Sequence, residues 1–238
     1  MDVTHLVLAL AGLLIGIMKA GFGGGVGVVV TPLLALVIPA KLALGVMLPL
    51  SLAADLIAIR YYWKYRVSRV VGSLIPGMAV GVLVGWILLD AIPDIWFRRV
   101  LGGLACVFGL LQALKDRLPR VPSVSAVAAG VALGVVSVLT HSGGIIMMLY
   151  LIPRGLSGRA FVATAVLVGL VLNSMKSLAY AHLGLLGPEV WRMDLFMLPT
   201  LAMGVGLGIL MNRGLPVVWF NRAILALVLV IGVRLMLS

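Results

Sequence analysis

Three polar residues lie inside long apolar runs, where burying an ionisable or amide side chain is energetically costly. Asp55 lies within 42–60, and Asn173 and Lys176 lie within 160–180. Asn173 and Lys176 are three residues apart, so they share one helix face. Because such side chains normally face a partner or a water-filled cavity, we expect Lys176 to attract an anion and Asp55 to modulate or relay a coupled proton. The alternative is an ion pair that only locks two helices together.

Two glycine-containing breaks interrupt other apolar segments and add donors for the same anion. Backbone N–H groups at a helix start bind oxyanions, and His141 is a second candidate proton carrier because imidazole titrates near neutral pH. The predicted substrate-binding residues are Lys19, Gly23, Gly24, Gly25, Thr140, His141, Ser142, Gly143, Gly144, Asn173 and Lys176, and the proton-coupling residues are Asp55 and His141. The alternatives are close helix packing through the glycines, a structural hydrogen bond for His141, and snorkelling of Lys19 to the membrane interface.

The composition places these residues in a membrane. The chain has 238 residues, of which 63% are hydrophobic and 11% charged, which is too little polar surface for a soluble globule. A spanning helix needs about 20 apolar residues, so almost no length is left for a soluble nucleotide-hydrolysing domain. The net charge of +11 fits cytoplasmic loops rich in Lys and Arg, so we expect no nucleic-acid partner.

An internal duplication organises the chain. Counterpart residues lie 123 positions apart near the end of each copy and about 118 positions apart further upstream. The pairs are Pro93 with Pro216, Trp96 with Trp219, Arg99 with Arg222, Lys41 with Arg159, Asp55 with Asn173 and Tyr62 with Tyr180. Repeat one is therefore 1–116, a linker covers 117–121, and repeat two is 122–238.

Each copy begins with a glycine-broken opening and continues with three ordinary helices. The openings are 3–38 and about 122–153, and the helices are 42–60, 71–89, 96–114, 160–180, 193–211 and 217–237. An opening of 36 residues would be about 54 Å long as one helix, too long for one crossing of a core of roughly 30 Å. It either crosses twice or forms a re-entrant pair, which gives an odd number of crossings per copy. We predict an all-α membrane protein of two inverted repeats with about 8–10 membrane segments. The distribution of Lys and Arg among the loops supports opposite orientations of the two repeats in the membrane.

Other residue patterns carry less chemistry. Glycines 77, 81, 85, 204 and 208 are interpreted as helix-packing positions, and Trp96, Trp219, Tyr61, Tyr62, Trp63 and Tyr65 as belts at the membrane interface. The sequence contains neither a Cys, His and carboxylate cluster at metal-ligand spacing nor a convincing Ser, His and acid set. We therefore predict no metal, no cofactor and no enzymatic activity.

The order of motifs also resembles a known family. It is carried by the segment Lys19–Gly27, Thr31-Pro32, Ala43-Leu-Gly, Arg159–Thr164, Asn173–Lys176, Tyr180 and Gly184-Leu185. These elements look like the sulfite exporter TauE/SafE family over nearly the whole chain. The resemblance implies a proton- or gradient-driven carrier of sulfite, sulfonates or related anions, usually outward. In this chain His141-Ser142-Gly143-Gly144 stands in place of a longer glycine run.

Together these observations predict a multi-pass carrier in the inner membrane that exports a small sulfur-containing anion by alternating access. Two alternatives stay open, a passive anion channel and a membrane assembly subunit that transports nothing. The expected partners are the anion and the lipid bilayer, and a homo-oligomer is left open. The exact anion, the direction and the coupling ion are not fixed by the sequence.

Overall fold

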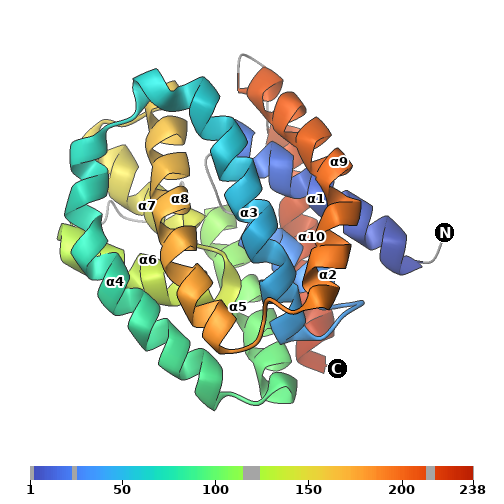
Figure 1. Ribbon diagram of the computed structural model, residues 1–238. Helices are drawn as coiled ribbons and strands as arrows, with labels where there is room; N and C mark the ends of the chain where they lie inside the picture. The colour runs from blue at the N-terminus through green and yellow to red at the C-terminus, as the bar shows by residue number, and fades with distance from the viewer. Residues whose placement is uncertain (1–2, 23–25, 115–123, 213–217, 238) are drawn as a thin grey trace.

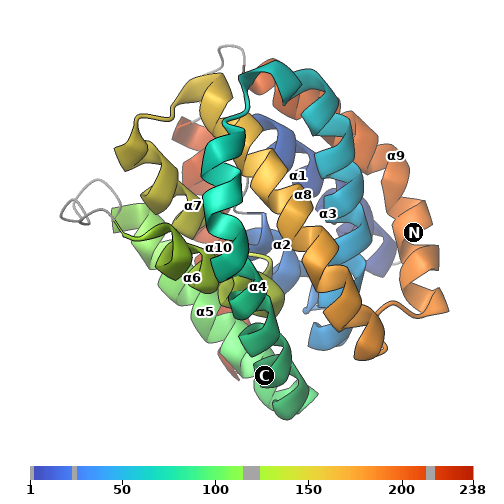
Figure 2. The same ribbon diagram turned by 60° about the vertical axis from the view of Figure 1, so that its left-hand side comes forward.

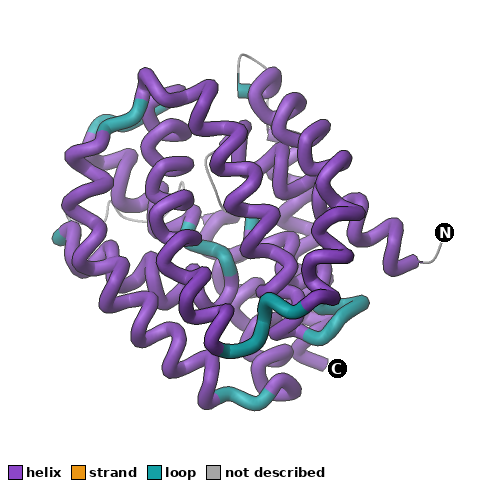
Figure 3. Tube along the Cα trace, in the orientation of Figure 1, coloured by secondary structure: helices purple, strands orange, loops and turns teal. Residues whose placement is uncertain are grey.

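The computed structural model describes residues 3–22, 26–114, 124–212 and 218–237, and these are helical apart from turns and short connections. Ten α-helices follow one another, with no strand in the described ranges (Figure 3). The helices are α1 (Val3–Phe22), α2 (Gly27–Leu34), α3 (Ala40–Tyr62), α4 (Ser68–Ala91), α5 (Asp94–Leu114), α6 (Ala126–Thr140), α7 (Gly144–Leu151), α8 (Gly158–His182), α9 (Pro188–Met211) and α10 (Val218–Leu237). Two 3₁₀ turns, Trp63–Tyr65 and Ile152–Arg154, extend α3 and α7. The predicted all-helical architecture is confirmed.

Five of these helices are long and apolar enough to cross a membrane, namely α1, α3, α4, α8 and α9. The short helices α2 and α7 have eight residues each, so each is about 12 Å long and cannot cross a hydrocarbon core of roughly 30 Å alone. Each predicted opening thus consists of one longer helix and one short helix. Helix α1 ends at Phe22 and α2 begins at Gly27, while in the second half α6 ends at Thr140 and α7 begins at Gly144.

Glycines let two helix pairs approach closely, as the sequence predicts. Gly204 on α9 packs against the carbonyl group of Leu13 on α1, and Gly81 on α4 packs against the carbonyl group of Val131 on α6. A side chain at either glycine would collide with this backbone. Gly77 and Gly208 also face backbone carbonyl groups of the neighbouring helix, and Gly85 faces the side chain of Val138. All five glycines therefore serve helix packing.

The helices pair in a way that relates the two halves of the chain. Helix α1 lies on α9 at one side of the molecule and α4 lies on α6 at the other, with α3 and α8 between them (Figures 1 and 2). Because α1 and α6 are counterparts, and α4 and α9 are counterparts, exchanging the halves turns one pair into the other. The pairs α3 with α8 and α5 with α10 are preserved by the same exchange.

Two buried tyrosines repeat one contact in both halves. Tyr62 on α3 donates a hydrogen bond to the carbonyl oxygen of Ala20 at 2.9 Å, and Tyr180 on α8 donates to that of Val138 at 2.6 Å. Each tyrosine thus fastens its helix to the last turn before a break. The interpretation of Tyr62 as part of an interfacial belt is wrong, since its side chain is fully buried. Tyr61, Trp63, Tyr65 and Trp96 are exposed, and the side chain of Trp219 lies outside the described residues.

Candidate functional site

The start of α2 meets the break between α6 and α7 inside the protein. Gly27, the first residue of α2, packs directly against the backbone of Thr140 and His141, so no side chain fits there. Thr31 Oγ1 then donates to the Thr140 carbonyl oxygen at 3.1 Å. The glycine and threonine of the first opening therefore hold it against the break of the second opening.

A cavity of about 40 Å³ lies beside this meeting point. This volume is enough for a few water molecules or a small ion. The polar part of its wall consists of Lys19, Ser51, Ser137, His141 and Asn173. Both short helices begin at the cavity, because Val26 precedes α2 while Gly143 and Gly144 start α7, and all three residues line it. Helix N-termini carry unpaired N–H groups and a partial positive charge, which favour an anion.

On one side of the cavity, an ion pair joins the first half to the second. Lys19 Nζ lies 2.7 Å from Asp55 Oδ2, and the Asn173 amide donates to the same oxygen at 2.8 Å. Asp55 is fully buried and Asn173 nearly so. Gly169 on α8 leaves the room for this group, since a Cβ there would lie 3.1 Å from Asp55 Oδ2 and 3.3 Å from Lys19 Nζ.

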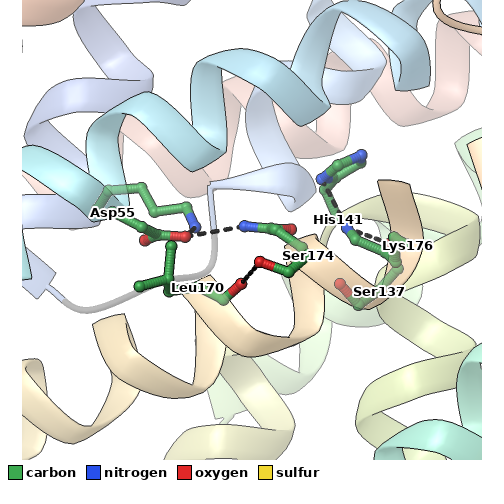
Figure 4. Close-up of polar contacts among 8 residues, drawn as sticks. Asp55, Ser137, His141, Leu170, Ser174 and Lys176 are labelled. Carbon is green, nitrogen blue, oxygen red and sulfur yellow. Dashed lines mark hydrogen bonds and ion pairs between the residues drawn. The ribbon is translucent and has the colours of Figure 1, made fainter. Parts of the chain in front are cut away.

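On the other side, a lysine and a histidine form a second buried pair. Lys176 Nζ lies 3.0 Å from His141 Nδ1 and donates to the Ser137 carbonyl oxygen at 3.2 Å. When Lys176 is charged, Nδ1 must accept, so the imidazole proton is on Nε2, which then donates to the Leu44 carbonyl oxygen at 3.2 Å. Figure 4 shows the polar side chains of both pairs, with Asp55 at one end of the group and Lys176 with His141 at the other.

The backbone at the second break is unusual. His141 has φ 55°, the left-handed region, and no other non-glycine residue in the described ranges has a positive φ. This conformation lets His141 cap α6, with its N–H bonded to the Ser137 carbonyl oxygen at 3.0 Å. Glycine is the residue that normally occupies such a position. A histidine at the end of α6 therefore gains an imidazole at the cavity at some conformational cost.

Thr140 and Ser142 hold the break together, and neither lines the cavity. The Thr140 hydroxyl donates to the Val136 carbonyl oxygen at 2.8 Å and accepts from the Ser142 N–H at 3.2 Å. The Ser142 hydroxyl donates to the Thr140 carbonyl oxygen at 3.1 Å. Their hydroxyl groups therefore form hydrogen bonds within the turn, and the two residues support the cavity wall without lining it.

The structure brings most of the predicted site residues together, in an arrangement that differs from the expected one. The partner of Asp55 is Lys19, whereas Lys176 lies behind His141 and Ser137 and does not itself line the cavity. Lys19 is therefore the cation at the cavity wall. Gly23, Gly24 and Gly25 lie outside the described residues.

Among the wall residues that sequence reasoning missed, Ser51 and Ser137 are polar, and Gly169 leaves the room for Asp55 and Lys19. The duplication contains the signal that finds them, because the offset of 118 that pairs Asp55 with Asn173 also pairs Lys19 with Ser137 and Ser51 with Gly169. Residues of these three counterpart pairs surround one cavity. Ser51 and Gly169 lie one turn before Asp55 and Asn173 on α3 and α8, and Ser137 is the counterpart of Lys19, so extending the repeat alignment to these positions would have indicated them.

The chemistry of this group favours binding over bond-breaking. It offers an ammonium group, two serine hydroxyl groups, an amide, an imidazole and two helix starts, which together suit a small oxyanion. In the described part of the chain no group of three or more His, Cys, Asp or Glu side chains could hold a metal ion.

The chain also matches a known protein family. The model of the family described as "Sulfite exporter TauE/SafE" matches residues 8–235. The chain belongs to the sulfite exporter TauE/SafE family. TauE/SafE proteins are membrane transporters and not enzymes, so the protein is a multi-pass membrane transporter whose family implies an anionic substrate. No curated protein and no solved structure matches the chain.

Proposed function

We propose that the protein carries a small sulfur-containing anion, such as sulfite or a sulfonate, out of the cell across the inner membrane by proton-coupled alternating access. The observation that carries this proposal is the cavity where the start of α2 meets the break between α6 and α7, with Lys19 in its wall. Carriers typically bind a substrate midway through the membrane, where discontinuous helices present their N-termini to it. Buried ionisable residues in such a place normally serve transport.

The helix pairing supports the proposal that repeat one (1–116) and repeat two (122–238) are inverted copies joined by the linker 117–121. Exchange of the halves relates α1 on α9 to α6 on α4, and it relates the tyrosine contacts at Ala20 and Val138. Two copies related in this way can rock against each other about the cavity and open it to either side in turn. A homo-oligomer stays a prediction.

The experiment is a flux measurement with the purified protein in proteoliposomes. The panel contains sulfite, sulfate, thiosulfate, taurine, sulfoacetate and chloride, each measured with and without an imposed pH gradient. A carrier gives saturable flux of a sulfur-containing anion that responds to the gradient.

Two other outcomes would contradict the proposal. Flux that neither saturates nor responds to the pH gradient would indicate a passive channel. No flux of any anion, from protein shown to be folded and inserted, would favour an assembly subunit in which the glycines at the breaks only pack helices.

A further inference from the structure

The Asp55 carboxylate is already paired with the cation that an incoming anion would need. Lys19 lines the cavity, yet its ammonium group already contacts Asp55 Oδ2 at 2.7 Å. Within a poorly solvated protein interior the two charges cancel most of each other's field, and a second anion near Lys19 would also be repelled by Asp55. The ion pair therefore closes the site to an anion as long as Asp55 is charged.

The same carboxylate has one oxygen ready for a proton. Both hydrogen bonds to Asp55, from Lys19 and from Asn173, go to Oδ2. In the described part of the chain Oδ1 is buried and has no hydrogen-bond partner. A proton from solvent can form an O–H bond at Oδ1 while Oδ2 still accepts from the Asn173 amide. Lys19 then loses its counter-charge without any change of the helix positions.

A second unpartnered group lies on the cavity side of this pair. Ser51 is one turn before Asp55 on α3, so the two share a helix face. Its side chain is almost fully buried and lines the cavity, and its hydroxyl has no partner among the described residues. A buried hydroxyl without a partner is unfavourable, and an anion held by Lys19 would supply an acceptor for it.

The other charged groups around Asp55 do not replace this role. Lys176 on α8 acts on the Asp55 carboxyl electrostatically, but its ammonium group is held by His141 Nδ1 and the Ser137 carbonyl oxygen. His141 accepts from Lys176 and is therefore neutral when Lys176 is charged. Helix α2, which also packs on α3, has no ionisable side chain between Gly27 and Leu34.

We propose that Asp55 is a tethered competitor of the transported anion: the anion binds Lys19 and Ser51 only when Asp55 takes up a proton at Oδ1, so that one proton is bound with each anion. This inference rests on the proposed transport of a sulfur-containing anion and specifies how the proton is coupled. Protonation of Asp55 leaves the positive charge of Lys19 without a counter-charge, and the bound anion then neutralises that charge.

The first test measures protons taken up when sulfite binds to the purified protein in weakly buffered detergent solution near neutral pH. Sulfite exchanges protons itself, so wild type is compared with Asp55→Asn, in which this contribution is the same and cancels. Wild type should take up close to one more proton per bound sulfite than the variant. The ratio of the two affinities should change by about tenfold per pH unit where Asp55 is ionised.

A second measurement on the wild-type chain applies even if the variant does not fold. Infrared difference spectra on sulfite addition should show a new absorption of a protonated carboxyl group. The matched control is Asp194→Asn, which removes another buried carboxyl group that has no hydrogen-bond partner in the described chain and is not part of the cavity wall. This variant should retain the sulfite-induced signal.

The possible failures are distinguishable. Sulfite that binds without extra proton uptake and without the carboxyl signal overturns the competition by Asp55 and leaves anion transport standing. Absence of sulfite binding to folded wild-type protein overturns both the competition and the sulfite substrate proposed above.

Discussion

The left-handed backbone at His141 gives a prediction that separates stability from transport. In an L-residue other than glycine this conformation costs on the order of 1 kcal/mol more than in glycine, and His141 adopts it with φ 55°. His141→Ala and His141→Gly both remove the imidazole and its contact with Lys176 at 3.0 Å. Removing the imidazole takes one hydrogen-bond partner from the buried Lys176 amine, which costs about 1–3 kcal/mol in either variant. Only the glycine variant also relieves the backbone.

We therefore expect His141→Gly to be about 1 kcal/mol more stable than His141→Ala, and both to be less stable than wild type. Equilibrium unfolding in mixed detergent micelles with increasing SDS measures the difference. Anion flux in proteoliposomes should fall to the same extent in both variants, since both lack the imidazole in the cavity wall. Equal stability of the two variants would refute the argument from the backbone, and normal flux would refute a role of His141 in the site.

Two further predictions concern packing and burial. Gly204→Ala forces a methyl group against the Leu13 carbonyl group and should destabilise the protein by about 1–3 kcal/mol. In the control Gly206→Ala, on the same helix, the added methyl group meets nothing within 4 Å and should stabilise the protein by up to about 1 kcal/mol. Similar thermal unfolding midpoints for the two variants would contradict the α1–α9 contact. Tyr180→Phe leaves the buried Val138 carbonyl oxygen without its 2.6 Å hydrogen bond and should cost about 1–3 kcal/mol, measured by SDS unfolding. Unchanged stability would show that another donor replaces the phenol.

The fold could be predicted from the sequence to the extent that apolar length and glycine determine it. Long apolar runs gave helices within a few residues of their observed ends, such as 160–180 for α8 (Gly158–His182). The packing glycines were recognisable because a spacing of four puts small residues on one helix face. Tyr62 was misinterpreted, because an aromatic residue at a helix end looks interfacial in sequence, and only the tertiary structure reveals the buried carbonyl oxygen of Ala20 that it contacts.

The sequence predicted some of the residues around the candidate cavity, among them Lys19, His141 and Asn173, and it did not predict how they pair. Membrane-buried charge is costly enough to identify Asp55 and Lys176 from sequence alone. Which cation Asp55 contacts depends on the rotation of α1, α3 and α8 about their axes, and periodicity fixes this only to a helix face. In the structure Asp55 pairs with Lys19, and Lys176 pairs with His141. The inverted arrangement of the halves stays a proposal that the helix pairing supports.

The central claim, that an anion binds at the cavity beside Lys19, is tested most directly by sulfite flux through Lys19→Gln in proteoliposomes. The matched control is Lys41→Gln, which removes a lysine near the start of α3 that does not line the cavity. With equal amounts of folded, inserted protein, we predict at least a tenfold loss of saturable flux for Lys19→Gln, equivalent to about 1.4 kcal/mol, and none for Lys41→Gln. Wild-type flux through Lys19→Gln would contradict the account.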